Sequence, residues 1–134
     1  MRRFGYIAFG AMIFACGAQA QTVSTGDQKF LQNEAQGTAY ELAIAKLAAQ
    51  KATQPDIKNY AQMIIQDHEQ LNTQLQQLAQ SKGVSLPSSM TAEQQTKLTR
   101  LQGLTGQEFD RQYENDTTQV NGQDKSEDQQ ELRA

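Results

Sequence analysis

The sequence predicts an all-α protein, an up-and-down helical bundle with a long N-terminal helical hairpin and a weak or incomplete fourth helix. Ala, Gln and Leu, which favour helices, are abundant, whereas Trp is absent and only two of the 134 residues are Pro. Apolar residues recur at helical spacing, and no strand-like alternation is visible outside the N-terminal segment. The length is that of one domain.

The first twenty residues have the pattern of a secretory signal peptide. Arg2 and Arg3 form a basic start, an apolar run covers residues 4–15, and Ala18-Gln19-Ala20 resembles a cleavage site. The apolar run is too short and too rich in Gly and Ala for a membrane span. We therefore expect cleavage after Ala20, no transmembrane segment in the mature chain, and a location in the periplasm or outer envelope.

Cys16 leaves a second interpretation open. Ile13-Phe14-Ala15-Cys16-Gly17 resembles a lipoprotein signal in which Cys16 would carry the lipid, although Phe14 is unusual in such a motif. If cleavage follows Ala20 instead, the mature protein has no cysteine. An exported protein without disulfides must hold its fold by packing alone.

The mature chain is acidic. Removing Arg2 and Arg3 from 12 Lys and Arg, against 15 Asp and Glu, leaves a charge of −5. This balance argues against binding to nucleic acid, which selects for basic surfaces, and against binding to anionic membranes. An acidic, Gln-rich surface mainly favours solubility.

After a polar leader at residues 21–26, Asp27 is expected to cap a first helix over about residues 28–52. With about 100° between residues, Glu34 and Glu41 lie on or beside the apolar side of this helix, and Tyr40 lies opposite it. The apolar side carries Leu31, Thr38, Leu42, Ala45, Ala49 and Ala52.

A second helix is expected from Pro55, which suits a first turn, to Lys82, with Gly83 just beyond its end. His68, the single histidine, lies near the middle of its apolar stripe, and Asp67 lies at the edge. The stripe is Ile57, Tyr60, Ala61, Ile64, His68, Leu71, Leu75 and Leu78. Two such helices form an antiparallel hairpin, which needs further helices or a partner to cover both stripes.

The rest of the chain predicts a shorter helix and a weak one. Thr91 and Gln94 have the spacing of a capping box that opens the third helix, and Gly106 breaks it. Phe109 and Tyr113 begin a fourth segment. Residues 114–134 carry few large apolar residues, so we expect a frayed helix or a disordered tail there. We place the helical domain at residues 27–120 and an acidic polar tail at residues 121–134.

Several short stretches, taken together, resemble the bacterial exported family catalogued as domain of unknown function 4142. They are Phe30-Leu31, Tyr40-Glu41-Leu42 with Lys46-Leu47-Ala48, Tyr60-Ala61-Gln62-Met63 with Asp67-His68, Lys82-Gly83-Val84-Ser85-Leu86-Pro87, and Phe109-Asp110-Arg111-Gln112-Tyr113. The resemblance implies a four-helix, ferritin-like bundle in the cell envelope and implies no activity. Family members usually carry a second histidine in a long last helix, whereas residues 114–124 contain none. This departure also indicates a weak fourth helix.

The candidate polar site is centred on His68. Ferritin-like metal sites use Glu from two helices and Glu-x-x-His from two others, but Ile65 stands three residues before His68. A mononuclear site for a first-row metal ion, formed by Glu41, His68 and either Asp67 or Asp110, remains an alternative. We favour a buried polar contact of His68 with Glu41 or Asp110. A further alternative leaves His68 partly hydrated beneath the fourth segment.

Patterns typical of enzymes are missing from the sequence. The mature chain has no Cys nucleophile, its linker serines have no histidine nearby, and it has no Gly-rich phosphate loop. We therefore expect an exported, non-enzymatic helical-bundle protein that associates with a second copy or with another helical protein. A stress-related role rests on fold analogy alone. The alternative is a metal-binding protein centred on His68 and Glu41, and no other cofactor is expected.

Overall fold

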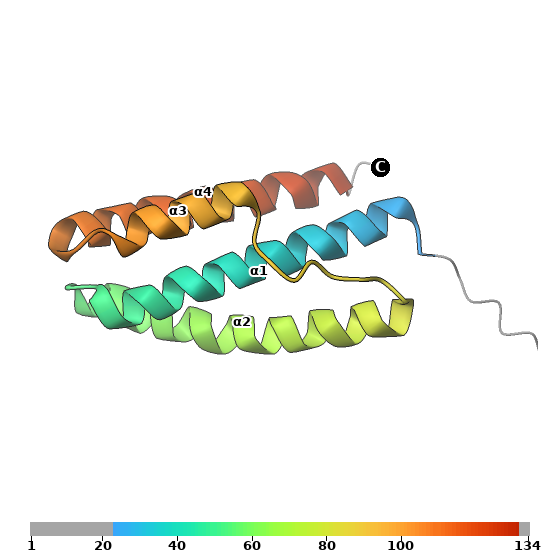
Figure 1. Cartoon of the computed structure of the whole chain (residues 1–134), viewed down its shortest axis with the longest axis horizontal. Helices are drawn as coiled ribbons and strands as arrows, with labels where there is room; N and C mark the ends of the chain where they lie inside the picture. Colours follow the sequence, from blue (N-terminus) through green and yellow to red (C-terminus); the bar gives the residue numbers. More distant parts are fainter. Residues whose placement is uncertain (1–22, 132–134) are drawn as a thin grey trace, which may run out of the picture.

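The computed structural model describes the backbone of residues 23–131 and the side chains of residues 23–119. Four helices make up the fold: α1 (Thr25–Lys51), α2 (Pro55–Lys82), α3 (Ala92–Gln102) and α4 (Gly106–Glu131). The described residues contain no strand. The long hairpin of α1 and α2 lies below α3 and α4, and successive helices run in opposite directions (Figure 1). The predicted all-α bundle is therefore confirmed.

Some predictions concern residues outside this range. The signal peptide at residues 1–20, Cys16 and the first residues of the leader lie outside the described residues. Within the described part, none of the helices has the length and apolar character needed to cross a membrane.

Local sequence signals set most helix ends. Pro55 is the first residue of α2, and Gly83 ends it with a φ of 67°. Thr91 and Gln94 form the predicted capping box of α3. The predicted cap of α1 was wrong: Ser24 is the N-cap, and its Oγ accepts the backbone N–H of Asp27 at 3.0 Å. A serine hydroxyl caps a helix as well as a carboxylate does, so the helix begins one turn earlier.

Helix α1 lies at the centre of the bundle and contacts the other three helices. Tyr40 is 1% exposed, so its predicted place on a polar side was wrong. That side of α1 packs against Leu101 of α3 and against Phe109 and Tyr113 of α4, in one core. Helix α1 is consequently buried on two sides, which a single amphipathic stripe does not reveal.

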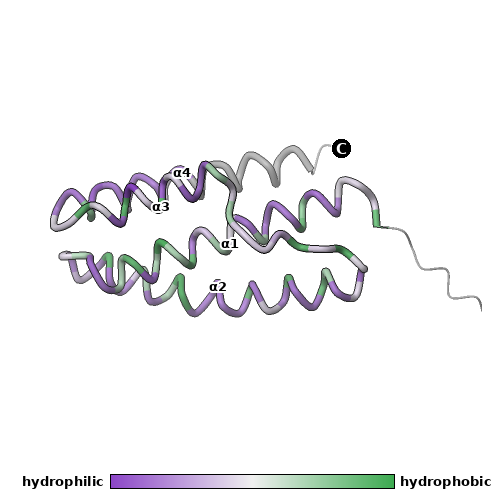
Figure 2. The backbone as a smooth tube through the Cα atoms, in the orientation of Figure 1, coloured by the Kyte–Doolittle hydropathy of each residue, from purple (hydrophilic) through white to green (hydrophobic). Residues whose placement is uncertain are grey.

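Helix α2 packs mainly on α1, and Figure 2 shows apolar positions recurring along both helices with polar positions between them. Its buried line runs through Ile57, Ala61, Leu75 and Ala79. Leu78 is 44% exposed, so its predicted place in the stripe was wrong. Ala79 lies in the contact instead, one residue or about 100° further round the helix.

Helix α4 extends further than the sequence pattern suggested. Its backbone is helical to Glu131 and so includes residues 121–131 of the predicted tail. Among the α4 side chains that the structure describes, those of residues 106–119, Phe109, Asp110, Tyr113 and Asp116 are buried.

The connection between α2 and α3 crosses over α1 (Figure 1). Two glutamine side chains of α1 hold it there. Gln32 donates to the carbonyl of Ser85 at 3.0 Å, and Gln36 donates to the carbonyl of Ser89 at 3.2 Å.

Candidate functional site

Glu41 of α1 and His68 of α2 meet inside the hairpin. His68 Nε2 lies 2.6 Å from Glu41 Oε2, and the two side chains are 16% and 14% exposed. Glu41 lies between the two buried sides of α1, and His68 lies on the buried line of α2, so both point inward. The predicted polar contact of His68 with Glu41 is thus what the structure shows.

The Glu41 carboxylate favours the charged form of His68. The hydrogen bond to Glu41 raises the pKa of His68 above its ordinary value; burial opposes this shift, and the negative charges of Glu41 and Asp67 support it. The carbonyl of Ile64, one turn earlier, also favours the protonated ring. The Ile64 carbonyl is not within hydrogen-bond geometry of the ring, because Nδ1 of His68 is buried without a partner. Nε2 of His68 is protonated in both the neutral and the charged ring, because Glu41 accepts a hydrogen bond from it.

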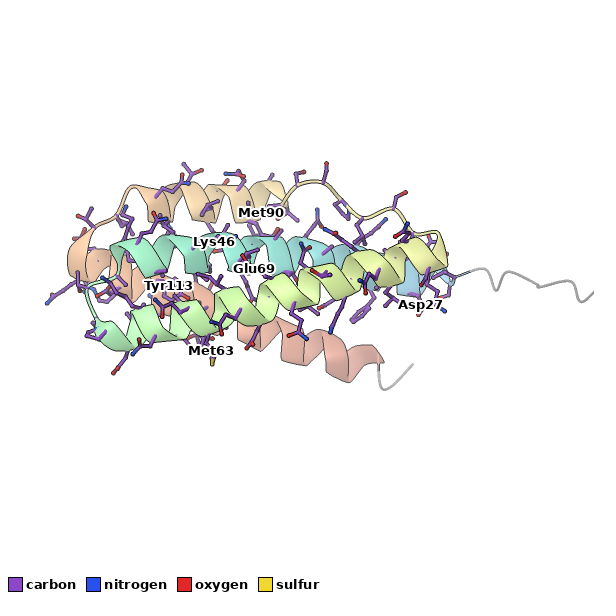
Figure 3. The ribbon with its side chains drawn as sticks, turned by 90° about the horizontal axis from the view of Figure 1, so that it is seen from below. Asp27, Lys46, Met63, Glu69, Met90 and Tyr113 are labelled. Atoms are coloured by element: carbon purple, nitrogen blue, oxygen red, sulfur yellow. The ribbon has the colours of Figure 1, made fainter. Side chains whose placement is uncertain are left out.

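A second ion pair links the same two helices at their outer edge. Lys46 Nζ lies 3.0 Å from Glu69 Oε1, and about half of each side chain is exposed. Both labelled residues lie where α1 and α2 run side by side (Figure 3). Because water screens it, this pair contributes less stability than the inner pair.

Asp110 was considered as a partner of His68, but it is hydrogen-bonded to the turn between α1 and α2. Its carboxylate accepts the backbone N–H of Thr53 at 3.0 Å, the backbone N–H of Gln54 at 3.2 Å and the Thr53 hydroxyl. Burial of Asp110 opposes ionisation, but these hydrogen bonds together lower its pKa below the ordinary value. Gln54, the residue before α2, makes no side-chain cap of its own. Asp110 therefore fastens α4 to the turn between α1 and α2.

The predicted metal ligands are not gathered into one centre. Glu41 and His68 come together, Asp67 is exposed beside them, and Asp110 is engaged at the turn. Across residues 23–119, no group of three or more His, Cys, Asp or Glu side chains could hold a metal ion. These residues do not fit a ferritin-like dinuclear site.

A buried cluster around Asp116 was missed in the sequence. Asp116 Oδ1 accepts Arg100 at 3.2 Å and Gln112 at 2.8 Å, and Oδ2 has no partner. Burial, and then the Asp116 charge, raise the pKa of Tyr40, whose hydroxyl also has no partner. A signal for Asp116 existed, because it lies three residues after Tyr113 and seven after Phe109, on the same helix face.

One comparison with known proteins gives a result for this chain. A family model described as "Domain of unknown function (DUF4142)" matches residues 15–133. The match extends beyond the stretch from Phe30 to Tyr113 that carries the resemblance, and it includes the region without a second histidine. No curated protein and no solved structure matches the chain. The chain belongs to the family described as domain of unknown function (DUF4142).

Proposed function

We propose that this chain is an exported, non-enzymatic helical-bundle protein of the bacterial cell envelope, and that it acts by associating with a second copy of itself through α2. Export is supported by the basic start, apolar run and Ala18-Gln19-Ala20 ending of residues 1–20. The family gives no activity that would point elsewhere.

The observation that carries the proposal is the uncovered apolar side of α2. Met63 is 49% exposed and Leu78 is 44% exposed, and they are the large hydrophobic residues that the described structure exposes. Leu71 lies between them along α2 and is only partly covered. Helices α3 and α4 pack mainly on α1 and on each other, and the described side chains leave much of Met63 and Leu78 accessible. Exposed large apolar residues along one helix support an interaction surface there.

The spacing of the exposed residues favours a second copy as the occupant. Met63 and Leu78 are about 22 Å apart along the helix, and Leu71 lies midway between them. Two antiparallel α2 helices related by a two-fold axis near Leu71 would place each Met63 against Leu78 of the other copy. Asp67 would then face Gln74, whose amide can donate to the carboxylate.

Such a dimer should be weak. One helix of each copy contributes to the contact, which is small beside the roughly 1,000 Å² that a stable interface needs. Sedimentation velocity across a wide range of protein concentration should therefore show a monomer–dimer equilibrium. A wild-type protein that remains a monomer at every concentration would refute self-association.

Two substitutions on α2, a test and its matched control, locate the contact. Met63→Glu should convert the dimer to a folded monomer, because it places a charge in the apolar contact. Gln66→Glu adds the same charge at an exposed position about 60° round the helix from Met63, on the side away from Leu71 and Leu78, and should leave the equilibrium unchanged. If both variants behave alike, the contact is not on the proposed side.

The proposed location has its own test. Fractionation of cells, with N-terminal sequencing of the exported protein, should yield a periplasmic chain that begins at Gln21. Lipid attached to Cys16, with the protein in the membrane fraction, would instead establish the lipoprotein alternative. A chain that keeps Met1 in the cytoplasm would refute export.

The second candidate function is metal binding at Glu41 and His68. A carboxylate and an imidazole from facing helices are ligands that suit first-row metals, and a metal ion would have to replace the hydrogen bond that joins this pair at 2.6 Å. Further ligands would have to come from water or a rearranged side chain. Metal analysis of protein purified from the periplasm, beside His68→Ala, distinguishes the two functions. A bound metal that the variant loses would favour the second candidate, and its absence from both leaves association.

A further inference from the structure

The thioether of Met63 is open to solvent. Met63 is 49% exposed, and Figure 3 shows its sulfur pointing away from the bundle. After residues 1–20 the sequence contains two methionines, Met63 and Met90, and no cysteine. An oxidant that reacts with sulfur in this part of the chain therefore meets a thioether, which it converts to a sulfoxide.

Met90 has the opposite surroundings. It lies just before α3, is partly buried and packs against the hydrophobic core of the bundle. An oxidant has to pass the packed side chains to reach its sulfur. The fold therefore gives the two methionines different access, and Met63 should react first.

The fold can accept a polar group at Met63. This residue lies outside the hydrophobic core that the described residues form, so a sulfoxide there displaces no core contact. Asn59 and Gln66 are exposed on the same side of α2, four residues before Met63 and three after it. Their amides can donate to a sulfoxide oxygen. A monomer oxidised at Met63 should therefore remain folded.

We propose that Met63 is an oxidation site that controls self-association, because its sulfoxide dissociates the dimer. This role rests on the proposed function, in which Met63 of one copy meets Leu78 of the other. A peroxide is the oxidant. Its O–O bond breaks, one oxygen atom is transferred to Sδ, the sulfur is oxidised by two electrons, and the other oxygen leaves as water with both hydrogens. The reaction takes place on the monomer, which a weak dimer always supplies.

The sulfoxide weakens the contact because its oxygen needs a hydrogen-bond donor. In the proposed dimer it would face Leu78, whose side chain has none. Burying a polar group without a partner is unfavourable, and the two-fold axis places one sulfoxide at each end of the contact. We expect the dissociation constant of the dimer to rise by about tenfold or more.

Treatment of the full mature chain with hydrogen peroxide tests both steps. Mass spectrometry of peptides should find the added oxygen on Met63 before Met90, and circular dichroism should show an unchanged melting temperature at that stage. Sedimentation velocity should then show the equilibrium shifted to the monomer. A mixture of the two methionine sulfoxide reductases, one for each sulfoxide epimer, should restore the dimer.

Two variants assign the effect to one sulfur. Met63→Leu keeps an apolar side chain of similar size that peroxide does not oxidise, so it should dimerise and stay dimeric after treatment. Met90→Leu is the matched control and should dissociate on treatment as the wild type does.

The outcomes separate this role from the proposed function. A dimer that persists when Met63 is fully oxidised, dissociation of Met63→Leu by peroxide, or equal oxidation rates of Met63 and Met90 in the folded protein would overturn the role of Met63 and leave the proposed function standing. A wild type that never dimerises would refute the proposed function and the role of Met63 with it.

Discussion

Replacing Glu41 with Gln tests whether the inner ion pair holds α1 to α2. The change keeps the size of the side chain and removes the charge that His68 faces at 2.6 Å. A hydrogen bond between charged groups contributes about 1.5–3 kcal/mol, and the pair is about six-sevenths buried, so solvent screens it little. We expect a loss of about 2 kcal/mol in the free energy of unfolding. For a domain of this size that equals a fall of about 8 °C in melting temperature.

The same pair makes stability depend on pH in a fixed direction. The pKa of His68 is raised in the folded state, so its charged contact is fully present below the unfolded pKa of about 6.5. The contribution is lost as pH rises through the folded pKa. Wild type should therefore lose stability between pH values near 6 and near 9, while Glu41→Gln should lose much less. The neutral ring still donates to Glu41, so part of the contact persists at high pH.

Urea unfolding followed by circular dichroism at both pH values measures these effects. Glu69→Gln breaks the exposed pair with Lys46 on the same two helices and serves as the control. It should cost less than about 1 kcal/mol. If Glu41→Gln costs no more than Glu69→Gln, or if all three proteins share one pH dependence, the inner pair does not stabilise the hairpin.

Three further changes have predicted outcomes. Asp110→Asn should cost about 1–3 kcal/mol in urea unfolding, because the Asp110 carboxylate accepts three donors at the turn. Since the pKa of Asp110 is lowered, this cost should be present above the unfolded pKa of about 3.9 and vanish as pH falls through the folded value; a loss unchanged in acid would contradict the assignment. Tyr40→Phe should leave the melting temperature nearly unchanged or raise it, because the Tyr40 hydroxyl has no partner, and a large fall would mean that the hydroxyl is bonded. Ser24→Ala should lower the free energy of unfolding by about 1 kcal/mol, because it removes the cap of α1. Asp27→Ala should lower it less. If thermal melts show the reverse order, Asp27 is the cap.

The helix ends were predictable because their causes are local. Pro55, Gly83 and the Thr91–Gln94 box act within one turn of chain, so the residues themselves specify them. The place of Tyr40 was not predictable in this way. It depends on α3 and α4 docking on a second side of α1, which the periodicity of α1 does not contain.

The candidate site also contains both contacts that could be predicted from the sequence and contacts that could not. Glu41 and His68 could be paired from the sequence, because each lies on the inward side of one arm of a hairpin. The contact between Asp110 and the turn at Thr53 joins residues 57 positions apart. Its formation depends on how α4 lies across the end of the hairpin. Asp116 was missed because the polar composition around it concealed that it continues the face of Phe109 and Tyr113.

Cross-linking is the most direct test of association through α2. The chain without residues 1–20 contains no cysteine, so Met63→Cys and Leu78→Cys can be combined in one protein. The two-fold arrangement brings these positions of different copies together, and a disulfide forms only where the two Cα atoms come within about 7 Å. Mild oxidation should therefore give a covalent dimer, and a protein carrying Gln66→Cys with Leu78→Cys should remain monomeric. A monomer from the first protein, or equal cross-linking of both, would contradict the account.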